Sequence, residues 1–227
     1  MKHAANKWLL LSTLVLVAGV AACDAANDPS ALEPVVVPQM SRAPDGWHAQ
    51  NKEALKALEK LEKERIKQEK ERRKAQKDSL KDTFEAYKKS GKLPKSRVGA
   101  EFVLCEPRDY DAETAIIGPA GGEIHVGEHR LIIPEGALQD WTLITMEAPP
   151  SLLVEVKFTP HGVHFDKQPQ LKLSYTRCYV PHNHPFRVVY IDDANNILEW
   201  PTSVDLKHFG VVWAWIEHFS KYALASN

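Results

Sequence analysis

The segment from Ile117 to Leu138 reads IGPAGGEIHVGEHRLIIPEGAL, and it carries the strongest indication of the fold. Two apolar runs, Glu123 to Val126 and Arg130 to Ile133, lie on either side of Gly127, which is typical of a β-hairpin. Pro134 ends the second run as a strand, because proline has no N–H to donate to a sheet. The segment therefore predicts antiparallel β-structure.

The same pattern continues through residues 98 to 227. Short runs rich in Val, Ile, Tyr, Phe or Thr alternate with turn signals such as His161-Gly162 and Asp192-Asp193. Many short strands with Gly and Pro between them are typical of a sandwich or barrel, and about 130 residues suffice for one core. The predicted fold class is mainly β, an antiparallel β-sandwich, with one short helical turn at Gly136-Ala137-Leu138. The predicted strands are Ile116-Ile117, Glu123 to Val126, Arg130 to Ile133, Leu143 to Ala148, Leu152 to Thr159, Gln170 to Tyr175, Arg187 to Ile191, Val211 to Ile216 and Lys221 to Ala225.

Three segments resemble the zonula-occludens and Unc-five domain (the ZU-five domain). They are IGPAGG at 117–122, LIIPEGAL at 131–138 and FTPHGVHFD at 158–166, where Thr159 replaces the first glycine of the family's Gly-Pro-x-Gly-x-x-Phe pattern. The resemblance covers residues 113 to 225 and implies a ZU-five-like β-sandwich. In animals this domain is usually an interaction module of ankyrins, netrin receptors and junction scaffolds. The resemblance therefore implies a binding or scaffolding role.

Near the end of the domain stands the tripeptide His218-Phe219-Ser220. Some relatives of the ZU-five domain, and one nuclear-pore protein, cut themselves between the Phe and Ser of this tripeptide. On a strand, residues two apart share a face, so His218 could accept the Ser220 proton. The Ser220 oxygen would then attack the Phe219 carbonyl, giving an ester that water opens, with help from a strained peptide bond. The other interpretation is that Phe219 packs in the core, His218 bonds locally and Ser220 shapes a turn.

The first 22 residues predict a signal peptide. A basic start precedes an apolar run from Trp8 to Val20, which is too short to span a bilayer core of about 30 Å. Val20-Ala21-Ala22-Cys23 resembles the bacterial lipobox, which implies cleavage before Cys23, a diacylglyceryl group on its sulfur and acyl lipid on the same residue. Such a lipid would anchor the protein to the extracytoplasmic face of the cell membrane or outer membrane. The alternative is an ordinary signal cut after Ala22. No other cofactor is predicted.

Residues 23 to 50 hold four prolines among small and polar residues, and they predict a disordered tether. Residues 51 to 92 predict one long charged helix, a stalk without Gly or Pro until Gly91. Opposite charges at spacing four, such as Glu59 with Lys63, support this helix. A heptad seam from Leu55 would run into charged residues and could not form a dry coiled coil. A solvated spacer is therefore favoured over weak self-association or a basic helix resting on anionic lipid or a wall polymer.

Charge divides the chain. Residues 51 to 97 hold 17 Lys+Arg and 9 Asp+Glu, a net of +8, and residues 98 to 227 hold 9 Lys+Arg and 17 Asp+Glu, a net of −8. This describes a basic rod joined to an acidic globular domain. Because export removes the chain from the cytoplasm, we expect no nucleic-acid partner. The expected partners are the membrane, through the lipid anchor, and an envelope protein or polysaccharide.

Two cysteines remain after lipidation of Cys23, and in an exported protein we expect Cys105 and Cys178 to form a disulfide, with two separate buried thiols as the alternative. A zinc site is not predicted, because neither has a second cysteine at ligand spacing. His182 and His184 fit a solvated loop better than a metal site. His125 and His129 flank the hairpin turn at Gly127 and are predicted to lie at the surface.

The chain contains no Gly-rich phosphate loop, Gly-x-Ser-x-Gly elbow or His-Glu-x-x-His motif, so a turnover enzyme is not predicted. Four tryptophans favour another possibility. Trp141, Trp200, Trp213 and Trp215 could form a surface that stacks on sugar rings, which would make the domain a polysaccharide-binding module. Trp213 and Trp215 share one face of a strand and are equally compatible with a place in the core.

Overall fold

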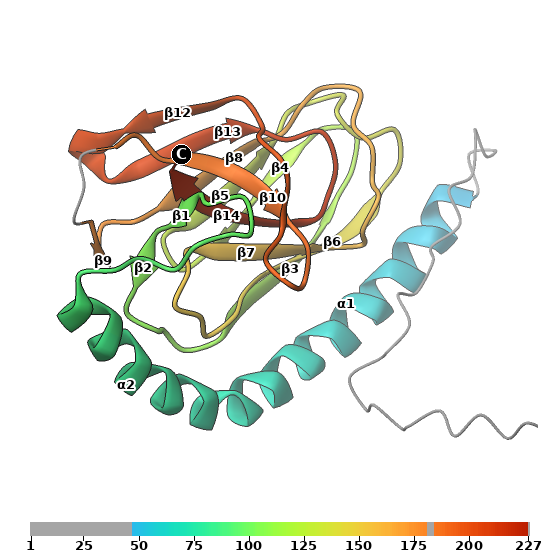
Figure 1. Ribbon diagram of the computed structural model, residues 1–227. Helices are drawn as coiled ribbons and strands as arrows, with labels where there is room; N and C mark the ends of the chain where they lie inside the picture. The colour runs from blue at the N-terminus through green and yellow to red at the C-terminus, as the bar shows by residue number, and fades with distance from the viewer. Residues whose placement is uncertain (1–46, 181–183, 227) are drawn as a thin grey trace, which may run out of the picture. The chain divides into compact units, whose positions relative to one another are not determined.

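The computed structural model describes residues 47–180 and 184–226, with side chains from Lys52 onward. The predicted signal peptide, Cys23, most of the predicted tether and His182 lie outside these residues. Two α-helices precede a set of antiparallel strands (Figure 1). The helices are α1 (Trp47–Arg72) and α2 (Lys74–Ser90). Helix α1 begins inside the segment predicted as tether, where residues 47–50 contain neither Gly nor Pro to prevent it.

The strands form two large antiparallel sheets that pack together, which confirms the mainly β prediction. Each of the nine predicted runs contains a strand. The seven-stranded sheet has the order β11 (Ile197–Glu199), β10 (Arg187–Ile191), β14 (Lys221–Ser226), β7 (Glu155–Thr159), β6 (Thr142–Ala148) and β3 (Asp111–Ile117), with β1 (Glu101–Phe102) also paired to β14. The five-stranded sheet has the order β12 (Ser203–Leu206), β13 (Val211–Trp215), β8 (Gln170–Ser174), β5 (His129–Ile133) and β4 (Gly122–Val126).

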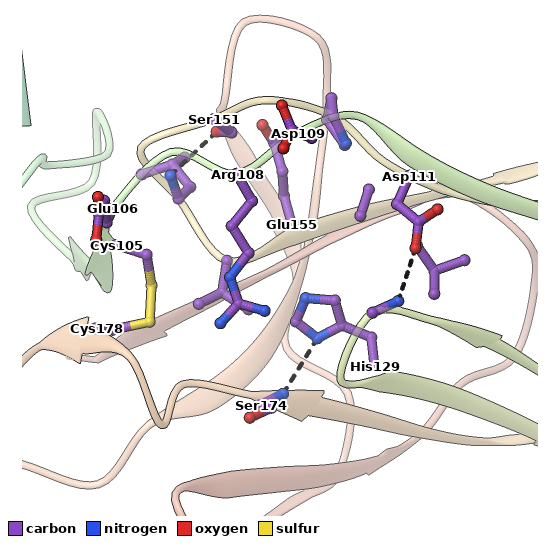
Figure 2. A pocket seen from close by; sticks show the side chains of 16 residues that line it. Cys105, Glu106, Arg108, Asp109, Asp111, His129, Ser151, Glu155, Ser174 and Cys178 are labelled. Carbon is purple, nitrogen blue, oxygen red and sulfur yellow. Dashed lines mark hydrogen bonds between the residues drawn. A yellow bond between two sulfur atoms is a disulfide. The ribbon is translucent and has the colours of Figure 1, made fainter. Parts of the chain in front are cut away.

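A third, two-stranded ribbon pairs β2 (Leu104–Cys105) with β9 (Cys178–Tyr179). Cys105 and Cys178 are register partners in this ribbon, and they form the predicted disulfide (Figure 2). Helix α2 packs against the ribbon, because Phe84 is buried in one cluster with Leu104. The disulfide thus joins the segment that follows the helices to the loop after β8.

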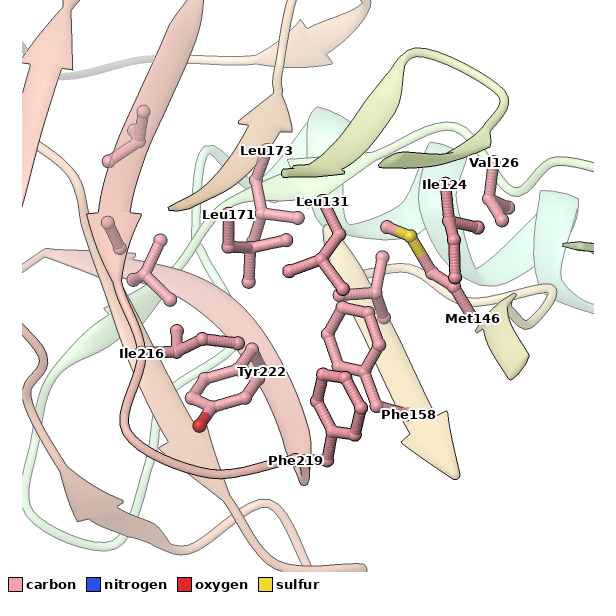
Figure 3. Close-up of a cluster of buried hydrophobic side chains, with 14 of the residues drawn as sticks. Ile124, Val126, Leu131, Met146, Phe158, Leu171, Leu173, Ile216, Phe219 and Tyr222 are labelled. Carbon is pink, nitrogen blue, oxygen red and sulfur yellow. The ribbon is translucent and has the colours of Figure 1, made fainter. Parts of the chain in front are cut away.

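The core between the sheets is filled by alternate residues of the longer strands (Figure 3). Strand β5 shows the pattern, since Leu131 and Ile133 are buried while Arg130 and Ile132 are partly exposed. Met146 and Phe158 enter the same core from the seven-stranded sheet. Fully burying a side chain of this size contributes roughly 1.5–3 kcal/mol, so the interlocking of the two sheets is the main source of stability.

The segments that carry the ZU-five resemblance lie next to one another. The Gly136 amide donates to the Pro119 carbonyl at 2.7 Å, and the Asp166 amide donates to the Ala137 carbonyl at 3.1 Å. Gly121 has φ +74°, and a Cβ there would collide with the Ile133 carbonyl oxygen. These backbone contacts explain why glycines stand at these turns.

The predicted helical turn at Gly136-Ala137-Leu138 is wrong. Gly136 has φ +74°, which lies outside the right-handed helical region, and the segment forms a turn closed by the Ala137 amide on the Pro134 carbonyl. The short 3-10 helix of the domain is η1 (Lys207–Phe209), between β12 and β13.

The helical segment also differs from the prediction of one helix. It is interrupted at Arg73, which has φ −89° and ψ 0°, although backbone hydrogen bonds still enter and leave this residue. Partly or fully buried side chains recur every three or four residues through both helices, as at Leu55, Ile66 and Phe84. One continuous stripe therefore faces the β-structure on both sides of the interruption.

The predicted solvated spacer is contradicted, because α1 packs against β3 and β6. Arg65 lies between the carboxylates of Glu62 and Glu147 and contacts both. These two acids raise the pKa of the Arg65 guanidinium above its usual range. Glu62 also accepts a hydrogen bond from Thr145 at 3.2 Å. The charged positions that cannot form a dry coiled coil instead form a polar seam with the chain's own sheet.

Two more ion pairs join the basic segment to the acidic domain. Lys70 lies 2.9 Å from Asp111, and Lys77 lies 2.9 Å from Asp109. Such exposed pairs contribute at most about 1 kcal/mol each. They therefore favour one orientation of the helices on the β-domain but add little to the stability of the contact. The opposite charges of the two halves thus meet along one contact.

Candidate functional site

The tripeptide His218-Phe219-Ser220 lies in the loop between β13 and β14. Phe219 is buried in the main core, with its ring 5.2 Å from that of Phe158 and 4.8 Å from that of Phe165. Ser220 is also buried, and its carbonyl accepts a hydrogen bond from the Phe158 amide at 3.0 Å. This local packing agrees with the interpretation in which Phe219 is a core residue.

His218 and Ser220 are not joined in the structure. The His218 ring packs edge-on against Tyr190, with centroids 5.0 Å apart, and its Nε2 lies 3.4 Å from a carboxylate oxygen of Glu199. The described residues contain no hydrogen bond between this ring and the Ser220 hydroxyl. None of the three residues of the tripeptide has a positive φ. The residues needed for an acyl shift are therefore close in the chain, but the His218 imidazole is not hydrogen-bonded to the Ser220 hydroxyl that it would have to deprotonate.

A cleft of about 440 Å³ opens beside the Phe219–Ser220 bond. The Phe219 carbonyl accepts a hydrogen bond from the Gly162 amide at 3.3 Å. His161 lies in the same cleft, where burial, chiefly, and the nearby Lys157 lower the pKa of its imidazole, while a contact with the Phe219 carbonyl opposes that change. An amide and an imidazole thus approach one carbonyl oxygen, which is a position where developing negative charge would be stabilised.

A second, smaller cavity of about 60 Å³ lies at the disulfide end of the domain (Figure 2). Arg108 and His129 point into it side by side. The prediction that His129 lies at the surface is wrong, because its position in β5 faces inward with Leu131 and Ile133. Its Nδ1 accepts the Ser174 amide at 3.2 Å. Burial, assisted by the Arg108 charge, lowers the pKa of His129 to about 4, so this imidazole is neutral.

The outer face of the five-stranded sheet carries an apolar strip beside the β12–β13 hairpin. Val211, Trp213 and Trp215 alternate with the buried Val212 and Ala214, so these tryptophans point away from the core. Two pairs of outward residues are register partners across the hairpin: Val204 with Trp213, and Leu206 with Val211. Trp215, further along the same face of β13, and Phe209, at the tip of the hairpin, complete the strip. We call this set the β12–β13 strip.

The side chains of the β12–β13 strip are accessible. Phe209 is 66% exposed and Val204 is 45% exposed, while Trp213 and Trp215 are half-buried. Helix α1 packs on the seven-stranded sheet, so it does not cover this face. Large apolar side chains gathered on one exposed face are typical of an interaction surface.

The other two tryptophans lie elsewhere. Trp141 packs on Gly118, and the ammonium of Lys52 lies 4.6 Å from its ring centre. Trp200 packs on a separate cluster that contains Phe102, and the Arg187 guanidinium lies 5.1 Å from its ring. Only Trp213 and Trp215 share the β12–β13 strip, so the predicted four-tryptophan surface is reduced to two neighbouring rings.

No described helix is long and apolar enough to cross a membrane. No group of three or more His, Cys, Asp or Glu side chains in ranges 52–180 and 184–226 is arranged to hold a metal ion. His161, His164 and His218 all line the cleft but do not form such a group.

No protein-family model matches the sequence, and no curated protein matches it either.

Proposed function

We propose that this protein is a lipid-anchored extracytoplasmic lipoprotein whose ZU-five-like β-domain binds another envelope protein. The observation that carries this proposal is the β12–β13 strip, in which Trp213 and Trp215 lie beside exposed aliphatic side chains. Aromatic residues are enriched at protein interfaces, where they bury a large area at a small cost in side-chain entropy. The anchor would be the lipid on Cys23, as the lipobox implies.

The composition of the strip favours a protein over a polysaccharide. Val204 and Leu206 offer only carbon atoms, which cannot hydrogen-bond to sugar hydroxyl groups. A protein partner would cover them with its own apolar side chains, and burial of apolar area is the main gain of such contacts. The antiparallel neighbour on the other side of β13 supplies Lys172 and Gln170, which would form a polar rim.

An affinity purification tests the proposal. Protein comprising residues 24–227 would be immobilised, incubated with solubilised envelope proteins and compared with the variant Val204→Lys. This substitution places a charge in the strip without touching the core, so we expect loss of a specific partner and an unchanged unfolding temperature. The matched control is Leu198→Lys, at a leucine on the seven-stranded sheet whose exposure is similar to that of Val204, and this variant should retain the partner.

Two outcomes would contradict the protein-binding proposal. One is a partner retained by Val204→Lys. The other is co-sedimentation of the wild-type protein with purified cell-wall polysaccharide, lost in Trp213→Ser, which would establish the polysaccharide-binding alternative instead. The anchor is tested separately, because Cys23→Ser should release the protein from the membrane fraction.

Self-cleavage at Phe219–Ser220 is a second candidate function. The observation that favours it is the Phe219 carbonyl, which borders the cleft and accepts the Gly162 amide. For this reaction His218 would have to leave Glu199 and accept the proton of the Ser220 hydroxyl. The intact mass of denatured protein tests it. Loss of residues 220–227, absent in Ser220→Ala, would establish cleavage, and a full-length mass would exclude it.

A further inference from the structure

Six lysines form a stripe along α1 and the first turn of α2. They follow one another at spacings of four, three, four, three and four residues, which places them on one side of a helix with 3.6 residues per turn. Their 18-residue span corresponds to about 27 Å at 1.5 Å per residue. All six are exposed: Lys56, Lys60, Lys63, Lys67, Lys70 and Lys74.

The packing of α1 creates this stripe by turning acidic residues toward the sheet. Glu62 and Glu69 belong to the partly buried stripe that faces β3 and β6, where each contacts an arginine of the same helix. The arginines Arg72 and Arg73 lower the pKa of Glu69 to about 2, which keeps its carboxylate charged. Two of the six acids between Glu53 and Glu71 are therefore partly withdrawn from the outer surface, while Glu53, Glu64 and Glu71 stay exposed beside the lysines.

The lysine charges remain available to a partner. Lys63 contacts Glu59 at 2.7 Å, Lys70 contacts Asp111 at 2.9 Å and Lys74 contacts Glu71 at 3.2 Å, yet these lysine side chains are between 46% and 68% exposed. The remaining three, Lys56, Lys60 and Lys67, make no ion pair within the described part of the chain. Surface pairs of this kind are weak and exchange readily with other anions.

We propose that this lysine stripe binds the phosphate groups of anionic phospholipids, so that α1 lies along the membrane surface. A cluster of four to eight basic residues on one helix face is sufficient for such binding, and a linear stripe matches a flat sheet of headgroups. The position of α1 in the chain agrees, since Trp47 follows Cys23 by 24 residues. The inference rests on the proposed lipid anchor, because a lipid on Cys23 would hold α1 close to the headgroups that the stripe contacts.

This arrangement assigns different faces to membrane and partner. The stripe lies on the helix that covers the seven-stranded sheet, whereas the β12–β13 strip lies on the outer face of the five-stranded sheet. A protein held along α1 would keep Val204 and Trp213 free for a second molecule. The stripe would thus restrict how the anchored domain is presented.

Vesicle binding of the unlipidated protein tests the stripe. Residues 24–227 would be sedimented with vesicles of phosphatidylglycerol and phosphatidylcholine, and with vesicles of phosphatidylcholine alone. We expect binding to the anionic vesicles only, weakened by salt because the Debye length shortens. The triple variant Lys56→Glu, Lys60→Glu and Lys67→Glu should lower the partition coefficient at least tenfold.

The control carries the same change of charge on the β-domain: Lys167→Glu, Lys172→Glu and Arg177→Glu. It should bind within about twofold of the wild type, since these residues lie outside the stripe, and far-ultraviolet circular dichroism would verify the fold of both variants. Equal losses in the two variants, equal binding to both vesicle types, or binding to an anionic wall polymer without vesicle binding would overturn the proposal. Failure here would leave Cys23 anchoring and partner capture untouched, because neither is used in this assay.

Discussion

The buried His129 should make the folded protein less stable in mild acid. Its imidazole is buried and neutral with a pKa of about 4, whereas an unfolded chain has a histidine pKa near 6.5. Below pH 6.5 the unfolded state binds the extra proton and the folded state does not, so stability falls as pH falls from 6.5 to 4. Since one pKa unit corresponds to 1.36 kcal/mol, the full effect is about 3 kcal/mol, of which about 2 kcal/mol is lost between pH 7 and pH 4.5.

The assay is urea unfolding of the wild type and His129→Asn at these two pH values. Asparagine keeps an acceptor for the Ser174 amide but has no proton to gain. The variant should be less stable at pH 7, because it fills the site less well, but its loss between pH 7 and 4.5 should be about 2 kcal/mol smaller. Other groups, such as Glu69, titrate in both proteins and cancel in this comparison. Equal losses in the two proteins would refute the assignment of a buried neutral histidine.

Three further predictions concern the fold. Replacing both Cys105 and Cys178 by alanine opens a link of sequence separation 73, which should cost about 4 kcal/mol in chemical unfolding; an unchanged midpoint would contradict a role of the bond in stability. Ile66→Ala should cost roughly 2–5 kcal/mol and raise amide hydrogen exchange in α1, because Ile66 is buried against the sheet; exchange equal to wild type would contradict helix docking. Gly121→Ala should destabilise strongly, since the new Cβ meets the Ile133 carbonyl at positive φ, and a neutral effect would contradict this backbone geometry.

The sequence predicts the strands well wherever apolar residues stand between Gly and Pro turn signals. Strands β4 and β5 are the clearest example, because Gly127 and Pro134 mark their ends. In the described part of the chain the five missed strands are short: β1, β2 and β9 contain two residues each, β11 contains three and β12 contains four. Such short segments carry little periodicity of their own, and only neighbouring strands or the disulfide make them part of a sheet.

The docking of the helices could not be predicted from an apolar stripe, because the contact is largely polar. Arg65 and Glu62 interrupt the apolar positions of the helix. Arg65 forms ion pairs with Glu62 and with Glu147, which lies 82 residues further along the chain on a strand of the sheet. The opposite net charges of the two halves were a signal for this contact. That signal does not specify which face of the helix meets which strand.

The sites show where alternation succeeds and where it fails. His129 shares its strand face with Leu131 and Ile133, so strict alternation would have placed it inside. Strand β13 has apolar residues on both faces, which leaves the direction of Trp213 undecided in the sequence. Its pairing with β8 and β12 settles that direction in the fold and exposes the β12–β13 strip.

The central claim is that the β12–β13 strip faces a protein partner in the envelope, and crosslinking from within the strip tests it most directly. A photoreactive amino acid would be introduced at Val204 in living cells, and at Leu198 as the exposed control on the other sheet. We expect Val204 to give one dominant adduct with another envelope protein and Leu198 to give little or none. Adducts of equal yield from both positions, or none from Val204, would contradict the claim.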